Sequence, residues 1–126
     1  DGIGGNAPVV DNISLDANKT YSVTVQVLDE SKSPAEDITT EIEEENFEHL
    51  FVYTPTPSNL LTITRTDKDN RNLEVGLKAS AVTTNAGTGT LRVVLYHQPP
   101  QNGVPIKDGT AKGSTDFDAQ FNVTIK

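Results

Sequence analysis

Apolar and polar residues alternate along much of the chain. Between Tyr21 and Val27 every second side chain is apolar, and Ser22, Thr24 and Gln26 stand between them. A period of two is typical of a strand with one face buried and the other in water. Read in this way, the sequence predicts strands at 9–15, 21–27, 47–54, 61–66, 73–81, 91–97 and 117–125.

The segments between these strands are rich in residues that favour turns. Asn, Asp, Gly, Pro and Ser gather at 16–19, 55–59, 67–72, 84–89 and 98–114, where they terminate regular structure. Short strands at this spacing predict an all-β fold, an immunoglobulin-like β-sandwich of about seven antiparallel strands.

One stretch, residues 34–45, departs from the alternation and predicts a short helix between the second and third strands. Asp37 is the expected N-cap, and Thr40 with Glu43 has the spacing of a capping box.

The acidic run Glu41–Glu45 falls in this expected helix, where Ile38 and Ile42 are one turn apart. We expect the run to form the solvated face of the helix and to complement its dipole. A role as ligands for a bound group is the alternative.

Composition narrows the class of protein. The 126 residues suffice for a single domain with a core, over residues 1–126. There is no Cys, Met or Trp, which excludes disulfides, thiolate metal sites and a cysteine nucleophile. A net charge of −8 argues against nucleic-acid binding, which depends on clustered cations. Residues 1–8 are expected to be a loop, with the natural chain truncated upstream of Asp1.

The only two histidines are the main candidates for a site. His49 is expected at the start of the third strand and His97 at the end of the sixth. These strands are antiparallel neighbours in an immunoglobulin-like sandwich. The alternation puts both side chains on the inward face, so they should meet at one end of the molecule.

Two imidazoles near carboxylates would suit zinc, copper or ferrous iron. The predicted ligands are His49, His97 and Glu48, with the run 43–45 close by. The competing interpretation is that each histidine is an ordinary strand-end residue hydrogen-bonded to a carbonyl or carboxylate. Beyond this transition metal, the sequence predicts no cofactor.

The segment Asp67–Asn72 has oxygen-bearing side chains at alternate positions, as a calcium loop would. It lacks the glycine of such a loop, and Glu74 comes too early to be the bidentate ligand. A hairpin turn is therefore the favoured interpretation.

We expect no enzymatic activity. No Gly-x-Ser-x-Gly elbow and no phosphate-binding glycine loop between a strand and a helix occurs in the sequence. A binding or interaction module remains, and such modules bind through the loops at the ends of a sandwich.

Four segments, 33–51, 76–77, 87–99 and 115–125, resemble a family of small lipoproteins secreted by Bacteroidetes and Flavobacteria. Glu48 and His49 match the family pattern, whereas Phe47 and Leu50 stand where similar sequences often have Asp and Gln. Members are described as having a type 1 periplasmic-binding fold, which is a two-lobed α/β architecture, and the alternation here argues against that fold.

The resemblance implies export, lipid anchoring through a cysteine upstream of this chain, and a place at the outer membrane, the cell surface or in the periplasm. On this resemblance we expect an accessory surface lipoprotein, and by analogy we expect its partner to be an outer-membrane receptor for nutrient uptake or another surface protein. Contact with the membrane is then expected only through the upstream anchor.

Overall fold

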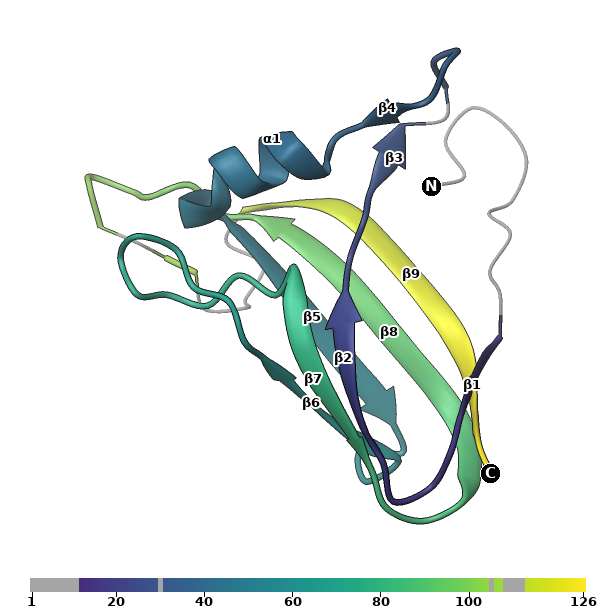
Figure 1. Ribbon diagram of the computed structural model, residues 1–126. Helices are drawn as coiled ribbons and strands as arrows, with labels where there is room; N and C mark the ends of the chain where they lie inside the picture. The colour runs from purple at the N-terminus through teal and green to yellow at the C-terminus, as the bar shows by residue number, and fades with distance from the viewer. Residues whose placement is uncertain (1–11, 30, 105, 108–112) are drawn as a thin grey trace.

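The computed structural model of the protein describes residues 12–29, 31–104, 106–107 and 113–126. Within them two β-sheets pack face to face, and a short helix lies at one end of the pair (Figure 1). The all-β sandwich predicted from the sequence is confirmed. The expected N-terminal loop, residues 1–8, and the start of the first expected strand lie outside the described residues.

The elements, in chain order, are β1 (Ile13–Leu15), β2 (Thr20–Thr24), β3 (Leu28–Asp29), β4 (Glu36–Asp37), α1 (Thr39–Glu44), the 3-10 helix η1 (Asn46–Glu48), β5 (His49–Thr56), β6 (Leu61–Arg65), β7 (Lys78–Thr83), β8 (Gly87–His97) and β9 (Ser114–Ile125). Each of the seven predicted strands has a counterpart here. The sequence did not predict the two-residue strands β3 and β4 as separate elements.

One sheet has the order β1-β9-β8-β5, the other the order β2-β7-β6, and β3 pairs with β4 alone. All described pairings are antiparallel except that of β1 with β9, which is parallel. The expectation of antiparallel strands throughout is therefore wrong at β1. This strand reaches the far edge of the sheet, where it runs in the same direction as the last strand.

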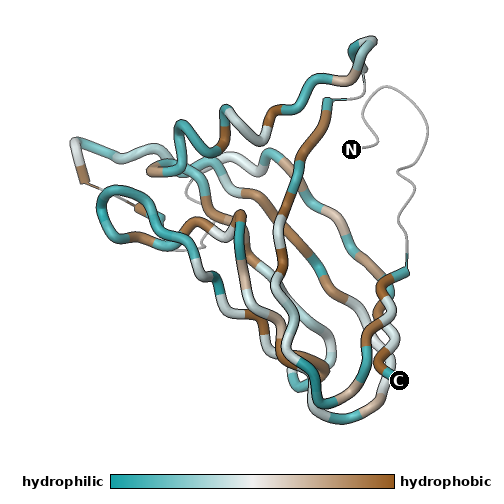
Figure 2. Tube along the Cα trace, viewed as in Figure 1, coloured by the Kyte–Doolittle hydropathy of each residue, from teal (hydrophilic) through white to brown (hydrophobic). Residues whose placement is uncertain are grey.

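The core lies between the two sheets and follows the predicted alternation. Phe51, Leu95 and Val123 are almost wholly buried on the first sheet, and Ala81 faces them from the second. Brown and teal segments alternate along the strands in Figure 2. Burial of the apolar face is the main stabilising term for such a fold.

The helix is shorter than predicted. It begins at Thr39 and not near Pro34, because Glu36 and Asp37 pair with β3 as strand β4. Ile38 is the N-cap residue and no side chain caps the helix, so the predicted N-cap at Asp37 is wrong. The Asp37 carboxylate still accepts a hydrogen bond from the Thr39 amide, at 2.9 Å.

The predicted capping box is also absent, because Thr40 and Glu43 both lie inside the helix. The helix docks through Ile42, which is 4% exposed, whereas Glu41, Glu43 and Glu44 are exposed as expected.

Strand β7 is the counterpart of the fifth predicted strand, 73–81. It begins at Lys78, five residues after the predicted start. Gly76 has φ +98°, a left-handed conformation, and a Cβ there would lie 2.8 Å from the Cβ of Phe51. The segment before it is pinned across the sandwich, since Phe51 donates to the Val75 carbonyl at 2.7 Å. This irregular link interrupts the alternating run.

Candidate functional site

The two histidines meet as predicted. His49 is the first residue of β5, His97 is the last of β8, and the two are directly paired across the sheet. Their rings stack with centroids 4.9 Å apart and an interplanar angle of 19°. The His49 side chain is 9% exposed and that of His97 is 35% exposed.

A tight turn between α1 and β5 brings carboxylates to this pair. The Glu48 amide donates to the Glu45 carbonyl at 3.0 Å, which forms the single turn η1. His49 Nδ1 lies 2.9 Å from the same carbonyl oxygen and donates to it, as a histidine at a helix C-terminus often does. Gln98 then donates its amide to the Glu48 carbonyl at 2.6 Å, which ties the end of β8 to the turn.

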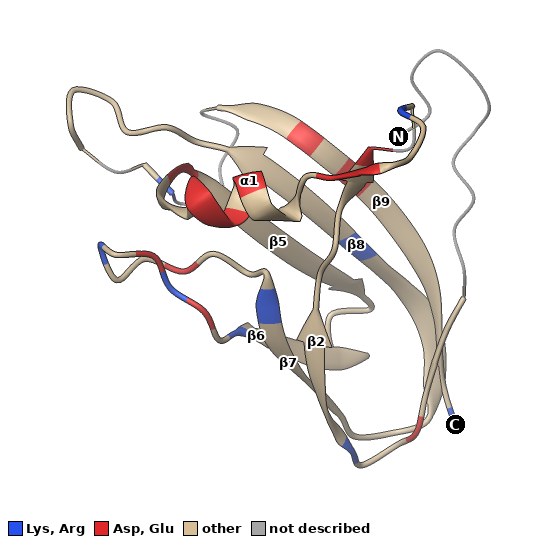
Figure 3. Cartoon of the chain, turned by 45° about the horizontal axis from the view of Figure 1, so that its top comes forward, with Lys and Arg blue, Asp and Glu red and all other residues tan. Residues whose placement is uncertain are grey.

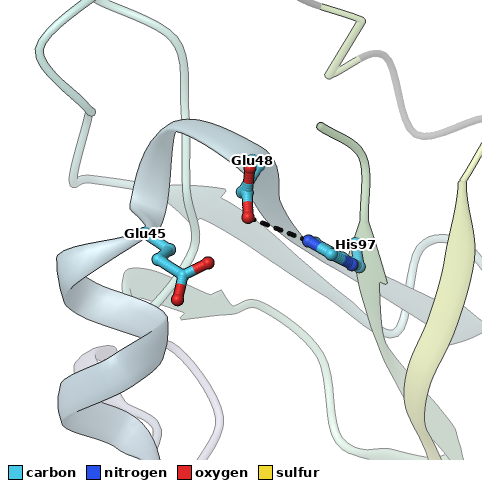
Figure 4. Close-up of side chains that lie close together, drawn as sticks. All are labelled: Glu45, Glu48 and His97. Carbon is cyan, nitrogen blue, oxygen red and sulfur yellow. Dashed lines mark hydrogen bonds and ion pairs between the residues drawn. The ribbon is translucent and has the colours of Figure 1, made fainter. Parts of the chain in front are cut away.

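The side chains of Glu45, Glu48 and His97 converge at this turn (Figure 4). His97 Nε2 lies 3.0 Å from Glu48 Oε1. One carboxylate oxygen each of Glu45 and Glu48 and one ring nitrogen of His97 all lie within 4.8 Å of one another. Within the described residues this is the one group of three histidine or acidic side chains so arranged.

The two carboxyl groups of this site affect each other's ionisation, and the pKa values of the two shift in opposite directions. The hydrogen bond from His97 lowers the pKa of the Glu48 carboxyl. The pKa of Glu45 is raised, because it hydrogen-bonds to the Glu48 carboxyl and lies in its negative field. Two close carboxylates resist ionising together, and a cation between them would relieve the repulsion.

The structure thus brings together His49, His97 and Glu48, the predicted ligands, and adds Glu45. His49 is not a member of the group of three. Its Nδ1 donates to the Glu45 carbonyl, and its ring is stacked on that of His97. The sequence carried a signal for Glu45, which stands three residues before Glu48 at the end of the acidic run. Whether these residues bind metal stays a prediction.

A pocket of about 380 Å³ opens next to the group, between α1 and the adjoining ends of β8 and β9. Its lining includes both histidines and Asp116, whose Oδ2 lies 3.7 Å from His49 Nε2. Sequence reasoning missed Asp116. Its signal was its place early in the last strand, which pairs with the end of the sixth.

The segment Asp67–Asn72 forms a tight turn, as the favoured interpretation predicted. Asp67 accepts hydrogen bonds from the amides of Gly76 and Leu77, at 2.7 and 3.1 Å. Asp69 accepts from the amides of Arg71 and Leu73 through one oxygen and from Lys107 Nζ through the other. These carboxylates hold the turn together, so their oxygens are engaged by the protein itself.

In comparisons with known proteins, no protein-family model, no curated protein and no solved structure matches the chain. Across the part of the chain that the structure describes, no helix combines the length and apolar character needed to cross a bilayer.

Proposed function

We propose that the protein is a non-enzymatic binding module that holds a divalent transition-metal ion, zinc fitting best, through Glu45, Glu48 and His97. The observation that carries this proposal is the convergence of one imidazole and two carboxylates within 4.8 Å. Zinc takes histidine nitrogen at about 2.0–2.1 Å and carboxylate oxygen at about 2.0–2.2 Å. The 3.0 Å between His97 Nε2 and Glu48 Oε1 is close to the separation of two ligands on one ion.

The surroundings support this assignment. Three protein ligands leave a coordination position open, as in zinc sites that accept a further ligand. Two carboxylates neutralise the charge of a divalent ion, and metal binding would release the proton that His97 Nε2 shares with Glu48. His49 would then be a neighbour that stacks on the ligand ring and fixes its orientation.

Calorimetric titration of zinc into the metal-free protein tests the proposal. The Glu48→Gln, His97→Gln double variant should bind zinc more than about 100-fold more weakly, since losing even an outer-shell partner costs about 10- to 100-fold. Asp118→Asn is the matched control, because Asp118 is exposed and pairs with Arg92 at 2.6 Å, outside the group of three. Unchanged zinc affinity in the double variant would refute the assignment.

We further infer that the sandwich is of the immunoglobulin type. Among the seven strands of three or more residues, the third, sixth and seventh (β5, β8, β9) share one sheet, and the second, fourth and fifth (β2, β6, β7) share the other. This is the grouping of that fold, with the first strand placed beside the last.

We propose that this module is an accessory lipoprotein at a bacterial outer membrane, anchored upstream and acting beside a nutrient-uptake receptor. The family resemblance supports this location, and the net charge of −8 suits a soluble surface domain. Affinity isolation from native outer membranes is the test. Recovery of the native protein only in the cytoplasm would contradict it.

A further inference from the structure

The carbonyl oxygen of Asn46 is a fixed point in the turn between the two proposed carboxylate ligands. Asn46 is the first residue of η1, with Glu45 directly before it and Glu48 at the end of the same turn. Its carbonyl oxygen accepts a hydrogen bond from the backbone N–H of His49, which closes the turn. The same oxygen accepts a hydrogen bond from Lys107 Nζ at 2.8 Å. Two donors from different segments therefore hold this one carbonyl in place.

A 3-10 turn of three residues needs such support, because its hydrogen bonds are less well aligned than those of an α-helix. A lysine that donates to a carbonyl at the C-terminus of a helix stabilises that end. Lys107 comes from the link between β8 and β9, far from η1 in the sequence. The conformation of η1 therefore depends on a tertiary contact and not on its own sequence alone.

Asp69 fixes the ammonium group of Lys107. Its Oδ2 lies 2.8 Å from Lys107 Nζ, and neither side chain is exposed to solvent. The other oxygen, Oδ1, accepts hydrogen bonds from the amides of Arg71 and Leu73 at 2.8 and 3.1 Å. Because the carboxylate is itself held by the backbone, the ammonium group is already in place where it meets the Asn46 carbonyl.

A second contact joins the same two segments. The central carbon of the Arg71 guanidinium lies 5.8 Å from the centroid of the Phe47 ring, within the range of a cation–π interaction. Phe47 is the middle residue of η1, and Arg71 belongs to the turn Asp67–Asn72, as Asp69 does. Figure 3 shows basic and acidic positions along this turn, close to the acidic end of α1. The turn Asp67–Asn72 thus supports η1 directly through Arg71 and indirectly through Lys107.

We propose that Lys107 is a positioning residue of the metal site: held by Asp69, it fixes η1 so that both carboxylate ligands face His97 before the metal binds. This inference rests on the proposed function. It gives the turn Asp67–Asn72 the role of an outer-shell group, whose loss weakens metal binding about 10- to 100-fold. By linkage, metal binding and an intact turn favour each other by the same factor.

The test compares zinc affinity, measured by calorimetry, in the wild-type protein and in the Lys107→Met, Asp69→Asn double variant. The two substitutions remove the donor to Asn46 and both buried charges together, so no unpaired charge is left buried and the net charge is unchanged. We expect the double variant to bind zinc about tenfold more weakly. Lys68→Met, at an exposed position of the same turn, is the matched control and should bind zinc as the wild type does.

Hydrogen exchange followed by NMR separates positioning from a general loss of stability. In the metal-free double variant, the His49 amide, which donates to Asn46, should exchange faster than in the wild type. The amides that join β8 to β9 should exchange as before. In the wild type, zinc should slow exchange at the Arg71 and Leu73 amides, because these hold Asp69.

The failure of this inference differs from the failure of the metal site. Equal zinc affinity in a folded double variant would overturn the positioning role and leave the metal site standing. Zinc binding to the wild type without slower exchange at the Arg71 and Leu73 amides would do the same, and this measurement decides alone if the double variant does not fold. A wild-type protein that binds no zinc would overturn the proposed function and this inference with it.

Discussion

Lys107 and Asp69 form an ion pair whose side chains have no solvent exposure. Lys107 Nζ donates to Asp69 Oδ2 and to the carbonyl of Asn46, both at 2.8 Å. Asn46 begins η1, the turn that ends at Glu48. A single lysine thus connects the turn between β6 and β7 to the segment that supplies a proposed metal ligand.

Removing this lysine should be strongly destabilising. Lys107→Met leaves the Asp69 carboxylate buried without its counter-ion, and breaking a buried pair in this way costs about 3–5 kcal/mol. Urea unfolding at neutral pH measures the loss. Lys68→Met, at an exposed position in the same turn, should change the free energy of unfolding by less than about 0.5 kcal/mol. If both substitutions lowered the free energy of unfolding equally, the buried pair would not stabilise the fold as proposed.

The same pair should make stability depend on pH. Burial alone would raise the pKa of Asp69, but hydrogen bonds from Lys107 and from the Leu73 and Arg71 amides outweigh it and lower the pKa. A carboxyl whose pKa is lower in the folded state stabilises the fold above its unfolded pKa of about 3.9. That contribution is lost as the pH falls through the lower, folded value.

The destabilisation caused by Lys107→Met should therefore be smaller at pH 3 than at pH 7. Urea midpoints of both proteins at the two pH values measure this difference. A loss that is the same at both would contradict the assigned role of Asp69.

At the scale of elements, the link before β7 depends on one backbone conformation. Gly76→Ala should lower the free energy of unfolding by about 2–4 kcal/mol, because it adds backbone strain and a clash with Phe51. Gly103→Ala is the matched control: φ is +74° there, but nothing lies within 4 Å of an added Cβ. It should cost only about 1 kcal/mol. Thermal or urea unfolding measures the stability of both variants. Equal losses of stability in the two would mean that packing at Gly76 contributes nothing.

The longer strands were predictable because burial alternates along them, as in β2, where Tyr21 and Val23 are the half-buried positions. The strands β3 and β4 have two residues each, too few for any period to show. The predicted helix began too early because Asp37 pairs with Leu28 in the short β3–β4 pair, and such pairing overrides local helix propensity. The parallel contact of β1 with β9 joins strands from opposite ends of the sequence, and no local pattern predicts such a contact.

At the scale of the molecule, several connections converge at one end. The β3–β4 pair, α1, the β6–β7 turn and the end of β8 lie there (Figure 1). The histidine pair could be predicted because strand order and parity together bring His49 and His97 to this end. Glu45 and Asp116 could not be predicted as site residues in the same way. The position of Glu45 depends on the geometry of a turn, and that of Asp116 depends on the strand register.

The central claim is that this end of the sandwich holds a metal ion, and a crystal structure of the zinc-loaded protein, measured at the zinc absorption edge, tests it most directly. We predict one anomalous peak about 2.0–2.2 Å from His97 Nε2 and from carboxylate oxygens of Glu45 and Glu48. A peak bound elsewhere, or no peak at this group after soaking in zinc, would contradict the account.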